Sequence, residues 1–427
     1  MNDLDRLERA KRQRPGAQQA ARLLRRFRTR RIRDAESLIR FHDLLLFLRA
    51  YPHSPAVLAL AESLLSTFGR RMTEYAAAGE DLGAFDDTEV SGISATSVTT
   101  DYSYDVVRWM HRRFGRRVRI DWEGYEGEDR LRAAWPEFLP LLEEEAIEDA
   151  NVPYRDYLRA AQGADGLAWL LSRIEDLPIA PREKSEHFDA LGFSVTWEVG
   201  DGRATRTHQR LRSGKPFFHN EPLLARRDVS LDAELSSPPM PMRRLSRREG
   251  AELIERAREA TALRYREYYA FTFGDPNAVL RADAGRGLQI FLVGTQRDRR
   301  LPLRSGYGGF LVKNGVPIGY FEALAFFERM EVGFNLYYAF REGESAWTFA
   351  RSLKLLRQAL GVTSFSLDPY QLGHENEEAL DSGAFWFYRK LGFESTSETL
   401  RSLTAREEKK IAADPSYRSS PSILRRL

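Results

Sequence analysis

The chain has 427 residues, of which 42% are hydrophobic and 30% are charged, the balance of a folded protein rather than a disordered one. This length exceeds one ordinary domain of about 150 residues, so we expect two or three domains. There is no cysteine, which excludes disulfides, thiolate metal sites and cysteine nucleophiles. No stretch approaches the roughly 20 apolar residues of a transmembrane helix, and no signal peptide is recognisable, so we expect a cytoplasmic protein without a membrane span.

The net charge of +3 is unevenly distributed, because residues 1–40 contain thirteen Lys or Arg against five Asp or Glu. The run LLRRFRTRR at 23–31 predicts a solvated basic helix or a flexible arm over residues 1–36. Arginine forms bidentate hydrogen bonds with phosphate, so contact with RNA is one interpretation of this arm. The other interpretation is a solvated tail without a partner.

Residues 37–185 carry the apolar spacing of helices. Four apolar residues recur at steps of three and four, which places them on one helical face: Leu38, Phe41, Leu45 and Leu48. Pro52 ends this helix and Pro55 begins the next. Further helices are predicted near residues 104–114, 130–144, 154–161 and 167–174. We therefore expect an α-helical domain over residues 37–185.

A connector is predicted over residues 186–240. Its run FSVTWEV at 193–199 precedes a Gly-Asp-Gly turn and predicts a β-hairpin with the alternating run that follows. The prolines of SSPPMP at 236–241 cannot continue a helix or a central strand. We place the main domain boundary there.

Helix and strand signals follow one another over residues 241–400. Ser246 and Glu249 form a capping box that predicts a helix over residues 247–271. The turn Lys313-Asn314-Gly315 is a strong hairpin signal, and Gly361 is expected to end a later helix. Strands are also predicted at 288–293, 331–338 and 363–368, with a last helix at 384–391 and a helical tail over 401–427. The predicted class is α+β with several domains.

The order of these elements, closed by FYRKLGF at 387–393, resembles the GNAT superfamily of coenzyme-A-dependent N-acyltransferases. The resemblance covers residues 241–400 and implies a mixed β-sheet flanked by helices. It implies direct transfer of an acyl group from acetyl-CoA or another acyl-CoA to an amine, either a small molecule or a protein. In that family the cofactor arm lies in a gap between two strands, and its pyrophosphate binds the N-terminus of the next helix.

The same resemblance assigns the cofactor-binding residues. The family's glycine loop falls on FREGESA at 340–346. Asp381 stands where the family usually has an asparagine seven residues before its tyrosine, and we prefer the nearby Asn376 as the equivalent. The residues implied to bind the cofactor are Arg341, Gly343, Ser345, Ala346 and Asn376.

Two catalytic roles are needed for amine acylation. The resemblance implies that Tyr388 protonates the departing thiolate, and a phenol suits this because it keeps its proton at neutral pH. A base must also take a proton from the amine, which a carboxylate on or near a strand can do. The candidate bases are Glu322, Glu331 and Asp368.

Two other interpretations stay open. A transferase of the same fold can take aminoacyl groups from charged tRNA, a partner that the basic arm would suit. Alternatively, the protein is a non-catalytic interaction or scaffold protein. The seven histidines lack the spacing of metal ligands, so no metal is expected.

Overall fold

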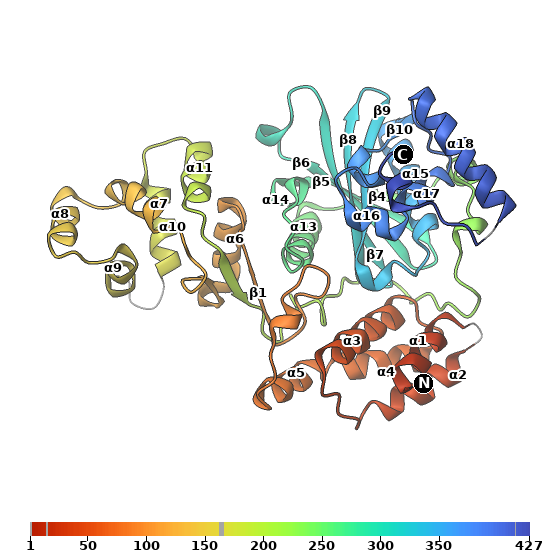
Figure 1. Cartoon of the computed structure of the whole chain (residues 1–427), viewed down its shortest axis with the longest axis horizontal. Coiled ribbons are helices and arrows are strands. Elements are labelled where there is room, and N and C mark those ends of the chain that lie inside the picture. Colours follow the sequence, from red (N-terminus) through yellow and green to blue (C-terminus); the bar gives the residue numbers. More distant parts are fainter. Residues whose placement is uncertain (1, 14–15, 162–165, 415) are drawn as a thin grey trace.

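The computed structural model describes residues 2–13, 16–161, 166–414 and 416–427. It has an N-terminal group of helices, a small lobe that projects to one side, and a larger part built on a seven-stranded sheet (Figure 1). The predicted α+β class is therefore confirmed. No helix among the described residues is long and apolar enough to cross a membrane.

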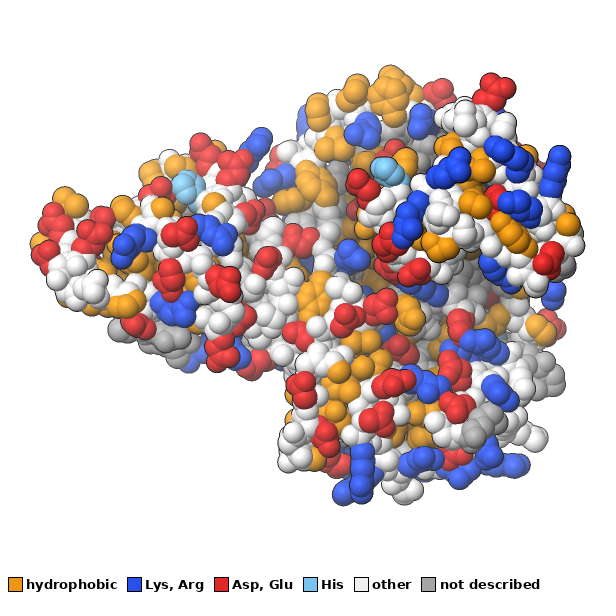
Figure 2. All heavy atoms as spheres, in the orientation of Figure 1, with side chains coloured by type: hydrophobic (Ala, Val, Ile, Leu, Met, Phe, Trp, Pro, Cys, Tyr) orange, Lys and Arg blue, Asp and Glu red, His pale blue; other side chains and the backbone are white. Residues whose placement is uncertain are grey.

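The N-terminal helices are α1 (Asp3–Arg12), α2 (Ala17–Arg26), α3 (Ala35–Ala50), α4 (Pro55–Leu65) and α5 (Phe68–Ala77). The predicted solvated arm is wrong, because its apolar residues form one buried side: Leu4, Leu7, Leu23, Leu24 and Phe27. Arg26 and Arg30 form ion pairs with Asp3, which neutralise part of the positive charge of residues 1–36. The visible face of these helices carries both acidic and basic side chains (Figure 2).

The small lobe contains three antiparallel strands in the order β1-β3-β2. They are β1 (Ser97–Thr100), β2 (Val118–Ile120) and β3 (Val195–Glu198). The lobe's helices are α6 (Tyr104–Phe114), α7 (Glu128–Ala134), α8 (Leu141–Asp149), α9 (Tyr154–Ala161), α10 (Gly166–Asp176) and α11 (Pro181–Leu191). Trp135, Phe188 and Trp197 are fully buried in its own core.

Three predictions for this region need correction. The hairpin after residue 193 does not form, because β3 pairs with β1 and β2 from far earlier in the chain. The single helix at 130–144 is two helices, and Pro140 directly precedes the second. A single helical domain over residues 37–185 is also wrong, since α3 and α4 share a core with the large sheet while the small lobe has a separate one.

The large sheet has the order β10-β9-β8-β7-β6-β5-β4. Its strands are β4 (Met242–Arg244), β5 (Gly274–Gly285), β6 (Leu288–Thr295), β7 (Ser305–Lys313), β8 (Val316–Phe326), β9 (Arg329–Leu336) and β10 (Ser364–Ser366). All neighbours are antiparallel except β10, which is parallel to β9. The predicted hairpin turn is confirmed, with φ of 49° at Asn314 and 81° at Gly315, the left-handed values that such a turn requires.

Helices cover both faces of this sheet. One face packs against α13 (Arg247–Ala262) and α14 (Tyr269–Thr272), and the other against α15 (Ser345–Leu360) and α17 (Ala384–Arg389). The helix predicted over 247–271 is interrupted, because the chain leaves helical geometry after Ala262 and Tyr265 has a φ of 55°. The remaining C-terminal helices are α12 (Leu231–Ser236), α16 (Glu377–Ser382), α18 (Glu398–Ala413) and α19 (Pro421–Leu424).

Candidate functional site

A gap opens between β9 and β10. The two strands pair only where Ser364–Ser366 lies beside Arg329–Glu331, whereas β9 continues to Leu336. Two side chains reach the unpaired edge of β9: Gln371 Oε1 accepts a hydrogen bond from the Phe334 N–H at 3.2 Å, and Arg341 Nε donates to the Leu336 carbonyl at 3.3 Å. An unpaired strand edge offers its backbone groups to an extended ligand. Such a ligand would replace the side-chain hydrogen bonds of Gln371 and Arg341 with its own.

Glu322 lies next to this gap, in the middle of β8. The residues directly opposite it are Gly308 on β7 and Gly333 on β9, and opposite residues of an antiparallel pair share a sheet face. A Cβ added to Gly308 would lie 2.9 Å from the Cβ of Ala270, so α14 fills the β7 side of Glu322, whereas a Cβ added to Gly333 would lie 3.8 Å from the Cβ of Glu322. Glu322 is solvent-exposed, yet partial desolvation raises the pKa of its carboxyl.

Glu331 shares the sheet face of Glu322. It pairs with Leu324 on β8, which makes it the diagonal neighbour of Glu322 across the two strands. The structure therefore brings two of the three candidate bases together. Asp368 has a structural role. Its side chain accepts a hydrogen bond from the Tyr370 N–H at 2.8 Å and caps the N-terminus of the short helix η7 (Pro369–Leu372).

A cluster of tyrosines with one arginine borders the same sheet face. The ring centres of Tyr268 and Tyr320 are 4.9 Å apart, those of Tyr320 and Tyr337 are 6.2 Å apart, and the Arg264 guanidinium lies 3.7 Å from the Tyr337 ring centre. The hydroxyls of Tyr268 and Tyr337 are buried and have no hydrogen-bond partner among the described residues. Burial raises the pKa of both Tyr320 and Tyr337, so these phenols keep their protons.

Sequence reasoning missed this cluster. Its members come from the segment after α13, from β8 and from the end of β9, and no local pattern joins these three places. The only signal in the sequence is the aromatic pair Tyr337-Tyr338 at the end of a predicted strand. That signal is typical of strands in general and does not identify a site.

The predicted pyrophosphate loop leads into α15, as expected, but its groups are engaged. Arg341 pairs with Glu378 of α16, and Ser345 Oγ donates to the Arg341 carbonyl at 2.6 Å. A Cβ added to Gly343 would lie 2.5 Å from the hydroxyl oxygen of Tyr51, so the end of α3 covers the loop. Ala346 is buried. The positive charge expected to meet phosphate is thus neutralised by an ion pair.

Asn376 has a structural role in the segment that leads to α17. Its Oδ1 accepts from the Ala379 N–H at 3.1 Å, and its Nδ2 donates to the Tyr370 carbonyl at 3.0 Å. The side chain therefore caps α16 and joins it to η7. Both ends of the amide are occupied, so contact with a cofactor would require these bonds to break.

Tyr388 lies on the opposite face of the sheet from Glu322. Its ring is buried against Phe349 at 5.4 Å between ring centres, and Phe349 in turn packs on Phe334 of β9 at 5.0 Å. Tyr388 also lines an apolar groove of about 720 Å³ between β10, α17 and α18, whose walls include Phe365 and other apolar side chains. Burial raises the pKa of the Tyr388 phenol. Glu322 and Tyr388 thus lie on opposite faces of the sheet.

Comparisons with models of protein families, with curated proteins and with solved structures gave no match for this chain. Within the described ranges, no group of three or more histidine, aspartate or glutamate side chains is arranged to hold a metal ion.

Proposed function

We propose that the chain is an N-acyltransferase of GNAT type, which transfers an acyl group from an acyl-CoA directly to an amine. The observation that carries the proposal is the end of pairing between the parallel strands β9 and β10, with Glu322 on one face of the sheet and Tyr388 on the other. The connection of these two strands by α15, and the placement of α13 and α14 between β4 and β5, support the same fold assignment.

The chemistry follows from this arrangement. The thioester lies along the free edge of β9, where the Phe334 N–H is released from Gln371 and donates to the ligand. Glu322 takes a proton from the amine, whose nitrogen attacks the thioester carbonyl carbon and forms the C–N bond. The C–S bond then breaks, and Tyr388 gives its proton to the thiolate. A raised pKa makes the Glu322 carboxylate a better base, and burial keeps the Tyr388 proton in place until it is needed.

Aromatic side chains border the Glu322 face on one side. Tyr268, Tyr320 and Tyr337 build an aromatic wall beside the Glu322 face. Tyr320 is only half-buried and keeps its proton, so it offers a hydrogen-bond donor to the amine substrate without adding charge. Gly333 has no side chain beside the carboxylate on the β9 side, whereas Ala270 and Phe271 of α14 fill the space over Gly308 on the β7 side.

The test is calorimetry of the full chain with acetyl-CoA, followed by an assay of free thiol release with a panel of primary amines. Glu322→Gln keeps the shape and removes the base, so turnover should fall about a hundredfold or more. The matched control is Glu328→Gln, an exposed carboxylate on the turn between β8 and β9, which should keep the rate. No cofactor binding at millimolar concentration, or equal turnover in the two variants, would reject the proposal.

A further inference from the structure

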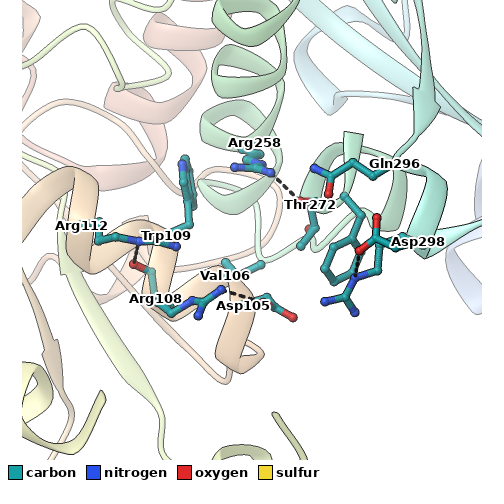
Figure 3. Close-up of a pocket in the computed structure, with 11 residues that line it drawn as sticks. Asp105, Val106, Arg108, Trp109, Arg112, Arg258, Thr272, Gln296 and Asp298 are labelled. Atoms are coloured by element: carbon teal, nitrogen blue, oxygen red, sulfur yellow. Dashed lines mark hydrogen bonds and ion pairs between the residues drawn. The ribbon is translucent and has the colours of Figure 1, made fainter. Parts of the chain in front are cut away.

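A second cavity lies at the junction of the small lobe and the sheet part, and it is separate from the β9–β10 gap. Helix α6 of the small lobe forms one wall, and α13, α14 and the turn η5 (Arg297–Arg299) form the other (Figure 3). Its volume is about 210 Å³. Ligands bind preferentially at junctions of this kind, because two rigid parts supply groups that converge on one space.

Positive charge dominates the walls of this junction cavity. Four arginines line it, against two carboxylates: Arg108, Arg112, Arg258, Arg299, Asp105 and Asp298. The two carboxylates lie 3.7 Å from Arg108 and Arg299, too far for tight hydrogen bonds. Among the described residues, no carboxylate lies within ion-pair distance of Arg112.

Two of the arginines are also balanced from outside the cavity. Arg108 pairs with Glu175 at 2.9 Å, and Arg258 pairs with Glu255 at 3.2 Å. These carboxylates reduce the positive electrostatic potential in the cavity, and the guanidinium groups of Arg108 and Arg258 still line its wall. With these partners counted, four carboxylates accompany the four arginines, and Arg112 is the lining arginine that makes no ion pair with the described residues.

The wall is held in place before any ligand binds. Arg258 Nε donates to the Phe271 carbonyl at 2.7 Å, and its Nη2 donates to the Thr272 carbonyl. Glu255 accepts from the Trp109 indole N–H at 2.9 Å, which ties α6 to α13. Burial lowers the pKa of Arg258, the charge of Glu255 opposes this shift, and the positive charge of Arg112 adds to it. An anion placed there would offset that positive charge.

We propose that the junction cavity binds the phosphate group of a small ligand. Guanidinium groups match phosphate because their parallel N–H donors form bidentate, charge-assisted hydrogen bonds. The volume suits a phosphate with a small substituent rather than a whole nucleotide. Arg299 lies over Phe273 at 4.5 Å and Arg258 over Trp109 at 5.8 Å, so an aromatic ring supports each of these two arginines of the α13–η5 wall. The inference does not depend on the proposed acyl transfer.

The probes are inorganic phosphate and glycerol 3-phosphate, titrated into the full chain by calorimetry in a buffer of low chloride. Saturable binding of one equivalent is expected. Arg112→Ala and Arg299→Ala should each weaken it about tenfold or more, because one charge-assisted hydrogen bond accounts for roughly that factor. Arg116→Ala and Arg297→Ala are the matched controls, since these exposed arginines lie close in sequence but do not line the cavity.

A variant that should tighten phosphate binding distinguishes recognition of phosphate from damage to the fold. Asp298→Asn removes a negative charge from the wall and should tighten phosphate binding, whereas mere damage to the fold would weaken it. Tighter binding of glycerol 3-phosphate than of phosphate would assign a phosphomonoester, and equal binding would assign free phosphate. The absence of saturable heat at millimolar phosphate, or equal losses in the control variants, would overturn the inference.

Discussion

The N-terminal end of α15 is anchored by a carboxylate that has no contact with solvent. Glu344 Oε2 accepts a hydrogen bond from Lys313 Nζ at 2.8 Å, and Oε1 accepts one from Arg286 Nε at 2.9 Å. The Leu224 N–H also donates to it at 3.3 Å. Burial opposes ionisation, but the Lys313 charge and the Arg286 hydrogen bonds outweigh it and lower the pKa of Glu344 to about 2. This single side chain therefore joins α15, β7, the β5–β6 turn and the connector.

Replacing Glu344 with glutamine should destabilise the fold strongly at neutral pH. The change leaves Lys313 and Arg286 without their counter-charge in a buried site, and loss of one partner of a buried ion pair costs about 3–5 kcal/mol. The pKa gives a similar size, because a fall from 4.5 to about 2 corresponds to about 3 kcal/mol of stabilisation by the ionised form. Since the folded pKa is lowered, this stabilisation is complete above pH 4.5 and is lost as the pH falls toward about 2.

The assay is urea unfolding of the full chain at pH 7 and again at pH 3. The free-energy gap between the parent chain and Glu344→Gln should be about 3 kcal/mol at pH 7 and clearly smaller at pH 3. Glu377→Gln is the control, because its exposed carboxylate pairs with the exposed Arg425 at the surface, where such pairs contribute about 1 kcal/mol or less. A gap below about 1 kcal/mol at pH 7, or one that does not shrink at pH 3, would refute this reasoning.

Three further predictions concern the turn and the proposed site. Asn314→Ala should cost about 3 kcal/mol in urea unfolding, because its amide donates to the Ala50 carbonyl at 2.8 Å and exchanges hydrogen bonds with the backbone of Phe217. Tyr388→Phe should slow thiol release without lowering the melting temperature, and an unchanged rate would remove Tyr388 from the mechanism. The rate of acyl transfer should rise with pH through a pKa above 4.5, because the base acts deprotonated, and a flat profile would exclude Glu322.

Local signals in the sequence were sufficient for the elements that are determined locally. The turn at Asn314 and Gly315 needs left-handed backbone, which these two residues adopt readily, and the capping box of Ser246 and Glu249 satisfies N–H groups within one turn. Gly361 ends α15 for the same local reason, with a φ of 72°. Each of these features depends on residues within four positions of each other, so tertiary contacts did not alter them.

Features that depend on distant partners could not be predicted in this way. The strand Val195–Glu198 has the alternating polar and apolar residues of a hairpin strand, but its partner strands lie far earlier in the chain. Its own residues do not indicate which strands these are. The apolar side of α1 and α2 is hidden among arginines, whose long side chains dominate the composition while Leu7 and Leu24 decide the packing. A high density of arginines predicts a solvated helix only when no neighbouring surface can bury the leucines of that helix.

The candidate bases show why the site itself needed the structure. Glu322, Glu331 and Asp368 are equivalent in the sequence, since each is a carboxylate on or beside a strand. In the fold, their neighbours differ. The Asp368 side chain caps a short helix, whereas Glu322 lies opposite a glycine on each of its two neighbouring strands. Those glycines are contributed by β7, where α14 covers Gly308, and by β9, so the surroundings of Glu322 exist only once three strands are in register. A side chain becomes a plausible base through its neighbours, and for Glu322 every deciding neighbour is on another strand.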